Sequence, residues 1–314
     1  MLVIDTEGLG AMDEDSTHDS KIFSLALLMS SYFIYNSVGS IDETALQNMN
    51  LVINLTKHIH LKAQGGEDID PEEYSKYFPA FMWVVRDFTL QLIDEEGEPM
   101  TSKDYLEKSL EPQKGFSDSI EQKNRVRRLL KSFFVDRDCN TMVRPLTKEE
   151  DLQNLENLKL EELRPEFVEQ VMQLRRKVIN RIKPKVLNGR KMTGEMLCNL
   201  AQTYIAAINK GVVPNIENAW TYICKNECVK AFHNALEKYD ITLKELAYNK
   251  IPMEEQELKQ CHKEARHAAV SDFGQKSVGP IASEYMKDLL LKVKQKYATI
   301  RTENEKETRV NRRK

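Results

Sequence analysis

The residues with the clearest capacity for chemistry lie within the first ten positions. Leu2-Val3-Ile4 is a short apolar run, which we predict to be a strand, and Asp5-Thr6-Glu7-Gly8-Leu9-Gly10 follows it. An aspartate at the carboxyl end of a strand can approach Mg²⁺, and a glycine three residues later lets the backbone approach a phosphate. Nucleotide triphosphatases use an Asp-x-x-Gly pattern in this way. A plain β-turn is the commoner explanation for so short a pattern, so it needs support elsewhere in the chain.

A second candidate follows the bulkiest apolar run of the sequence. Phe81-Met82-Trp83-Val84-Val85 has the composition of a fully buried central strand, and it ends in Arg86-Asp87. A carboxylate at this position can accept two hydrogen bonds, from N1 and N2 of guanine, which adenine cannot supply. The alternative is a salt-bridged arginine–aspartate pair at a strand end, which is common and has no ligand.

The elements that would position these residues form an α/β pattern up to about residue 215. The acidic stretch 12–20 has no apolar periodicity and suits a mobile switch loop, and residues 21–35 are expected to form a buried apolar helix or a helix–strand junction. Pro, Gly and Asn residues punctuate the rest, with Asn188-Gly189 as a turn. Further helices are expected over 42–62, from 101 onward, over 119–134, 165–183 and 192–209, and a short strand over 141–143.

Beyond residue 215 the pattern is helical throughout. Helices are expected over 217–239, 253–273 and from 281 to the end, separated by breaks at Pro252 and at Gly279-Pro280. We therefore predict a fold that is α/β and then all-α, with a domain of residues 1–215 followed by the start of a helical domain, residues 216–314.

Composition narrows the class of protein. The chain has 314 residues, of which 41% are hydrophobic and 30% charged, with a formal net charge of −3. This charge argues against non-specific nucleic-acid binding, and the basic end of the chain (309–314) is most simply a solvated helix end. The longest apolar stretch falls short of the ~20 residues that a membrane span needs.

The cysteines favour a reduced compartment, which indicates a cytoplasmic protein. Five of them are scattered along the chain. Cys224 and Cys228 lie four residues apart on an expected helix, and Cys261 adjoins His262. A metal cluster needs a second paired motif, so ordinary core or surface thiols are the preferred interpretation.

Together, these segments resemble the guanylate-binding proteins, which are large GTPases of the dynamin superfamily related to atlastins. The resemblance begins with 5–10, 19–23, 35–39 and 83–88, the last reading Trp-Val-Val-Arg-Asp-Phe. It continues in the family's order through 133–134, 144–145, 163–167, 203–204 and 214–219. The implied fold is an incomplete P-loop-GTPase-type, mostly parallel sheet with flanking helices, followed by a helical domain.

The resemblance also implies roles for residues. Asp5 would reach Mg²⁺ through water, Glu7 would organise the attacking water, and the Gly8 amide would face the γ-phosphate. Thr6 and Leu9 would complete this nucleotide-binding segment, and Arg86-Asp87 would be the guanine-reading pair. The segment after Arg144-Pro145 would include a loop that caps the base. Relatives hydrolyse GTP, dimerise through their GTPase domains and act in the cytoplasm or peripherally at membranes.

Two family elements do not occur within these 314 residues. No Gly-x-x-x-x-Gly-Lys-Ser loop is found, although that loop supplies the phosphate cradle, and the switch-I threonine is not found either. We expect this chain to bind nucleotide weakly and to hydrolyse it negligibly. Three explanations compete: an incomplete chain of a working GTPase, a short pseudo-GTPase or helical scaffold that acts through protein–protein interaction, or a structural helical protein.

Overall fold

A computed structural model describes residues 1–6, 16–49, 59 and 75–311 of the chain. By its internal packing the chain divides into two compact units, residues 1–217 and residues 218–314. The first unit contains the strands and the second is helical, which confirms the predicted order of α/β followed by all-α. The two units are described separately below.

The first unit is built on a parallel sheet whose described strands have the order β1-β2-β3. The strands are β1 (Tyr32–Val38), β2 (Ala80–Arg86) and β3 (Arg137–Thr141). Five consecutive residues of β2, Phe81 to Val85, are buried, as predicted for a central strand. Trp83 is fully buried and its Nε1 donates a hydrogen bond of 2.9 Å to Ser37 Oγ on β1. A central strand covered on both faces needs such an uninterrupted apolar run.

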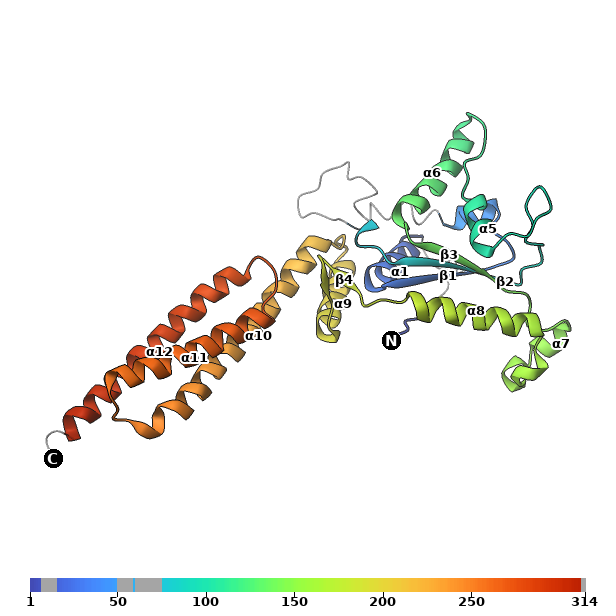
Figure 1. Ribbon diagram of the computed structural model, residues 1–314. Coiled ribbons are helices and arrows are strands. Elements are labelled where there is room, and N and C mark those ends of the chain that lie inside the picture. The colour runs from blue at the N-terminus through green and yellow to red at the C-terminus, as the bar shows by residue number, and fades with distance from the viewer. Residues whose placement is uncertain (7–15, 50–58, 60–74, 312–314) are drawn as a thin grey trace. The chain divides into compact units, whose positions relative to one another are not determined.

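Helices cover both faces of this sheet (Figure 1). On one face, Phe81 of β2 stacks on Phe134 at a centroid distance of 4.7 Å, and Phe33 of β1 meets Phe23 edge to face. Phe23 belongs to α1 (Ser16–Met29), and Phe134 follows α6 (Asp118–Phe133). The same unit contains α2 (Glu43–Asn48) and α5 (Ser102–Ser109), the latter started by a Thr101–Asp104 capping box.

The opposite face is covered by α8 (Pro165–Arg181). Its apolar side chains pack against Met82 and Val84 of β2, whose side chains alternate with the aromatic ones of the other face. Asp138 on β3 anchors the same helix through Lys177 Nζ at 3.2 Å and Arg181 Nη1 at 2.6 Å. The position of α8 is therefore fixed by both apolar packing and a partly buried ion network.

The remaining elements of the first unit are short, apart from α9. They are α7 (Glu149–Leu152), the 3₁₀ turns Leu155–Asn157 and Leu160–Glu162, β4 (Val186–Leu187), β5 (Arg190–Lys191) and α9 (Gly194–Asn209). The turn predicted at Asn188-Gly189 is confirmed, since both residues have positive φ (47° and 76°) and join β4 to β5.

Three local predictions were wrong or displaced. Leu2-Val3-Ile4 is neither paired nor buried, because a strand needs a neighbour and this short run has none among the described residues. Of the two alternatives for 21–35, the helix–strand junction is confirmed, because α1 ends before Ser30 and Ser31 and the β-rich run of β1 follows. Residues 16–20, assigned to a loop, begin α1, and the strand expected at 141–143 lies at 137–141. Residues 12–15 and most of 49–62 lie outside the described residues.

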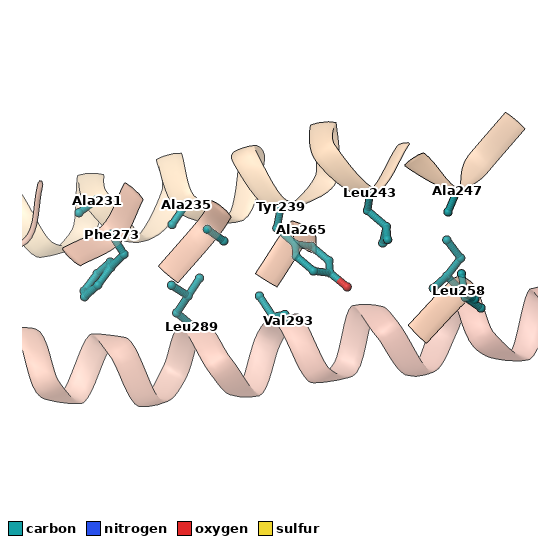
Figure 2. Close-up of a cluster of buried hydrophobic side chains, with 12 residues drawn as sticks. Ala231, Ala235, Tyr239, Leu243, Ala247, Leu258, Ala265, Phe273, Leu289 and Val293 are labelled. Atoms are coloured by element: carbon teal, nitrogen blue, oxygen red, sulfur yellow. The ribbon is translucent and has the colours of Figure 1, made fainter. Parts of the chain in front are cut away.

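The second unit consists of long helices around a continuous apolar core. They are α10 (Ile216–Leu246), which enters the unit at Asn218, α11 (Glu255–Lys276) and α12 (Ala282–Asn311), with a 3₁₀ turn at Tyr248–Lys250. Figure 2 shows side chains of α10 at four-residue spacing pointing toward Leu289 and Val293 of α12. Asn304 of α12 holds the loop before α11, since its side chain both accepts from Met253 N (2.8 Å) and donates to Met253 O (2.9 Å).

Cys224 and Cys228 are both buried in this unit. Cys228 Sγ donates to the carbonyl of Val278, in the loop between α11 and α12, at 3.3 Å. Within the described residues, no group of three or more His, Cys, Asp or Glu side chains is arranged to hold a metal ion. A search of the same residues found no helix with the length and apolarity required to cross a bilayer.

We expect His262 to make the second unit sensitive to acid. Its Nδ1 lies 2.9 Å from the buried Tyr239 hydroxyl on α10, and its ring stacks on Tyr297 of α12 at 4.0 Å. Burial lowers the pKa of His262, and the nearby Arg266 acts in the same direction. The folded state therefore prefers neutral histidine, so its contribution to stability is complete above the unfolded pKa of about 6.5 and is lost as the pH falls below it.

We expect the urea midpoint of the second unit to fall between pH 7.5 and pH 5, with His262 contributing less than about 1 kcal/mol because the ring is partly exposed. Acid also acts on the rest of the unit, so the readout is the difference between wild type and His262→Gln. His267→Gln, on the exposed side of the same helix, is the matched control. A pH dependence that is identical in wild type and His262→Gln would contradict the assignment.

Candidate functional site

The carboxyl ends of the three parallel strands form one edge of the sheet in the first unit. Gly39, after β1, donates its backbone N–H to Arg86 O at 2.8 Å. Phe88, after β2, donates to Met142 O, after β3, at 2.9 Å. These bonds hold the exits of neighbouring strands side by side (Figure 1). In open α/β sheets, ligands bind at this edge, because the loops that follow the strands converge there.

Arg86 and Asp87 lie at the centre of this edge, where β2 ends. Arg86 is exposed, and its Nε donates to Asn36 Oδ1 on β1 at 2.9 Å. Asp87 has φ +53°, in the left-handed region, which aspartate tolerates better than most residues. Its side chain is 37% exposed. The strand thus changes direction at a residue whose carboxylate is accessible to a ligand.

Arg144 places a positive charge beside this carboxylate. Its Nε lies 3.8 Å from Asp87 Oδ2, and its Nη1 donates to Glu149 Oε1, in the first turn of α7, at 3.3 Å. The Arg144 side chain is itself 42% exposed. An ion pair this accessible contributes little to folding, at most about 1 kcal/mol. The cluster Asp87–Arg144–Glu149 therefore adds little to the stability of the fold.

The other predicted site residues are only partly described. Asp5 and Thr6 are exposed and belong to no helix or strand. Glu7, Gly8 and Leu9 lie outside the described residues. An exposed carboxylate such as that of Asp5 is compatible with a water-mediated contact to Mg²⁺, since this ion keeps several of its waters when it is bound. The predicted roles of these five residues stay predictions.

Sequence reasoning assigned no role to Asn36 or Glu149, and it treated Arg144 only as the start of the capping segment. The structure brings Asn36 to Arg86 and Arg144 to Asp87. A signal for Asn36 and Arg144 was available in the sequence. Asn36 is among the last three residues of β1, and Arg144 follows shortly after β3. Because the short strand was expected at 141–143, the sequence could not show that Arg144 lies beside Asp87.

Chemically, this edge can recognise a polar planar group. The Asp87 carboxylate can accept two parallel N–H donors, and the Arg144 guanidinium offers N–H donors next to it. The backbone that carries these groups is bonded to its neighbour at the strand ends, so the fold sets where along the edge they lie.

Two family descriptions match the chain. "Guanylate-binding protein, N-terminal domain" covers residues 1–186, and "Guanylate-binding protein, C-terminal domain" covers residues 188–311. Human guanylate-binding protein 2 is 35% identical over 294 residues, which are 92% of this chain and 49% of the relative. Guanylate-binding protein 3 of Mus musculus is 33% identical over 310 residues, 97% of this chain and 50% of the relative.

The similarity therefore includes nearly the whole chain but only part of each relative. The chain spans about half the length of the curated relatives that it matches. The residues that match the N-terminal family description include all of the described strands of the parallel sheet and the edge at which Arg86, Asp87 and Arg144 meet. On this evidence the chain belongs to the guanylate-binding protein family.

Proposed function

We propose that this protein binds guanine nucleotides at the carboxyl edge of the parallel sheet, with Asp87 reading the base. The observation that carries the proposal is the accessible Asp87 carboxylate, directly after β2 with its buried run Phe81–Val85, with Arg144 at 3.8 Å. Guanine presents adjacent N1 and N2 donors to such a carboxylate, whereas adenine presents an acceptor at N1. The names of the relatives, guanylate-binding proteins, support the same ligand class.

We further propose GTP hydrolysis with Mg²⁺ as the activity of the whole protein. Asp5 would contact the ion through water, and Glu7 would help to position the attacking water. Dimerisation through the nucleotide-binding domains and a cytoplasmic location, peripheral to membranes, belong to the same proposal. These properties rest on family membership, and the chain covers about half of each relative.

The 314 residues alone are expected to be impaired. Their sequence contains no Gly-x-x-x-x-Gly-Lys-Ser loop, so the backbone cradle and lysine that hold the phosphates in P-loop enzymes are not supplied. Loss of comparable charge stabilisation slows phosphoryl transfer by roughly 10³- to 10⁵-fold.

The test uses the purified chain with GDP, ADP and GTP. We expect weak binding that favours GDP over ADP, and GTP turnover at least about 10³-fold below that of a relative that contains the loop. Turnover at the rate of such a relative would contradict the argument about the phosphate cradle. Equal binding of GDP and ADP, or no binding by a folded chain, would contradict base recognition and favour a scaffold that acts through protein–protein interaction.

A further inference from the structure

We propose that the outer face of α8 is a docking surface for a bilayer of anionic lipids. This basic–apolar surface consists of Met172, Arg175, Arg176 and Ile179, which lie at i, i+3, i+4 and i+7 of the helix and are all exposed. The proposed function includes a location peripheral to membranes, and this surface would make that contact. Its evidence is independent of the nucleotide site, so either assignment can fail without the other.

The segment from the middle of α8 to the start of α9 is strongly basic. Residues 170–194 contain no aspartate or glutamate, and their eight basic residues are Arg175, Arg176, Lys177, Arg181, Lys183, Lys185, Arg190 and Lys191. The dipole of a helix favours cations in its last turn. Arg175 and Arg176 lie more than one turn before the end of α8 at Arg181, so the dipole does not account for them.

Only part of this charge is used within the fold. Lys177 and Arg181 are paired with Asp138, and Lys185 Nζ donates to the carbonyl of Ser30 at 2.8 Å. The exposed residues that form no ion pair with the described part of the chain are Arg175, Arg176, Lys183 and Lys191. A positive surface without internal compensation attracts an external anion.

Apolar side chains are exposed between these charges on α8. Met172 is 39% exposed and Ile179 is 54% exposed. They are not needed to attach the helix, because other apolar side chains of α8 pack on the sheet, namely Phe167, Val171 and Leu174. The outer face therefore presents two apolar side chains with a pair of arginines between them.

The β4–β5 hairpin repeats this combination directly after α8. Val186 lies opposite Lys191 in the antiparallel pair, so their side chains share one face of the hairpin. Both residues are exposed, whereas the neighbouring Leu187, whose side chain points to the other face, is buried. A second exposed apolar and basic pair thus follows the first one along the chain.

This mixture of side chains fits a lipid surface better than a nucleic acid. Met172 and Ile179 lie about 10 Å apart along the helix axis, so both can enter the boundary of the acyl region while Arg175 and Arg176 contact headgroup phosphates. Proteins that bind single-stranded nucleic acid combine basic residues with aromatic side chains on which bases stack. Residues 170–194 contain no Phe, Tyr, Trp or His.

The experiment measures partitioning of the full 314-residue chain, without nucleotide, onto vesicles of phosphatidylcholine with and without about 30% phosphatidylserine. We expect binding only to the vesicles that contain phosphatidylserine, and weaker binding at high salt. Arg175→Gln/Arg176→Gln should lower the partition coefficient roughly 30-fold. The matched control is Arg125→Gln/Arg128→Gln on the exposed side of α6, where Arg128 is paired with Glu121; it removes the same charge and should bind like wild type.

A second pair of substitutions tests the apolar contribution. Met172→Ser/Ile179→Ser leaves the charge unchanged and should weaken vesicle binding at least about tenfold. The urea midpoint of each variant verifies that it is folded. Wild type that does not bind the anionic vesicles, or an α6 control that loses as much binding as the α8 arginine variant, would overturn the proposal.

Two other outcomes would assign the binding elsewhere. A loss of vesicle binding only in Arg309→Gln/Arg312→Gln/Arg313→Gln would assign it to the basic end of the chain and overturn the role of α8. If a single-stranded oligonucleotide binds as tightly as the vesicles and Met172→Ser/Ile179→Ser changes neither affinity, the partner is a nucleic acid and the lipid proposal is wrong. None of these results alters the expected preference for GDP over ADP.

Discussion

Replacement of Asp87 by asparagine is expected to change the base preference of this protein from guanine to xanthine. An asparagine side chain offers one acceptor and one donor in place of two acceptors. It can still accept from N1–H, but its amide donor faces the N2 amino group of guanine, whereas xanthine has a carbonyl oxygen at that position. A polar group that loses its hydrogen-bond partner in a binding site weakens binding of that ligand. We therefore expect the Asp87→Asn variant to bind XDP at least about tenfold more tightly than GDP.

Asparagine is the informative substitution because of the backbone at this position. Asp87 has φ +53°, which asparagine adopts readily, whereas alanine would add strain of about 1 kcal/mol. Asp87→Ala should abolish the preference for GTP over ATP, but part of its effect would be structural. Glu98→Gln, an exposed carboxylate in the following loop, is the matched control. If Asp87→Asn and Asp87→Ala both bind nucleotides with the wild-type preference, Asp87 does not read the base.

Gly279→Ala is expected to be the most destabilising small substitution in the second unit, with a loss of about 3 kcal/mol in the free energy of unfolding. Gly279 has φ +76°, and a Cβ at this position would lie 2.4 Å from Cys224 Sγ. Cys224 is only 2% exposed, so its sulfur has no room to retreat. The expected loss combines the strain of a left-handed alanine with overpacking between the α11–α12 loop and α10.

Gly274 gives a control of the same chemistry with the opposite expected sign. It lies near the end of α11, and a Cβ there would have no atom within 4 Å. Gly274→Ala should therefore stabilise the unit by roughly 0.5–1 kcal/mol, because alanine favours the helix. The two variants are compared by urea denaturation monitored by circular dichroism.

A double variant separates the two contributions at Gly279. Cys224→Ala removes the sulfur atom but keeps the Cβ, which would lie 3.1 Å from the added methyl group. Cys224→Ala/Gly279→Ala should therefore recover most of the overpacking part relative to Cys224→Ala alone and leave about 1 kcal/mol of backbone strain. Equal stability of the Gly279→Ala and Gly274→Ala variants would show that the loop can move away from α10 at no cost.

Several elements of this protein were predictable from local sequence. The run Phe81 to Val85 specified a buried central strand, because five consecutive β-favouring apolar residues can be satisfied only with cover on both faces. The helices of the second unit followed from their apolar periodicity and from breaks at Pro252 and Gly279-Pro280. Arg86-Asp87 could be proposed as a site because the strand before them was clear.

Other features needed the tertiary structure. Leu2-Val3-Ile4 has strand composition but is neither paired nor buried, since pairing depends on a neighbour that local sequence does not specify. The stretch 21–35 could be predicted only as either one helix or a helix–strand junction, because apolar runs do not by themselves show where a helix passes into a strand.

The sequence by itself determined the order of α/β and helical parts, the central strand and the family, because these depend on residue composition and on patterns that are local. Only the tertiary structure decided that Arg144 lies beside Asp87 and that Cys224 leaves no room for a side chain at Gly279. Each of these contacts joins segments that are distant in the chain. Their distances are set by strand register and helix packing, which depend on all the elements together and not on any one stretch of sequence.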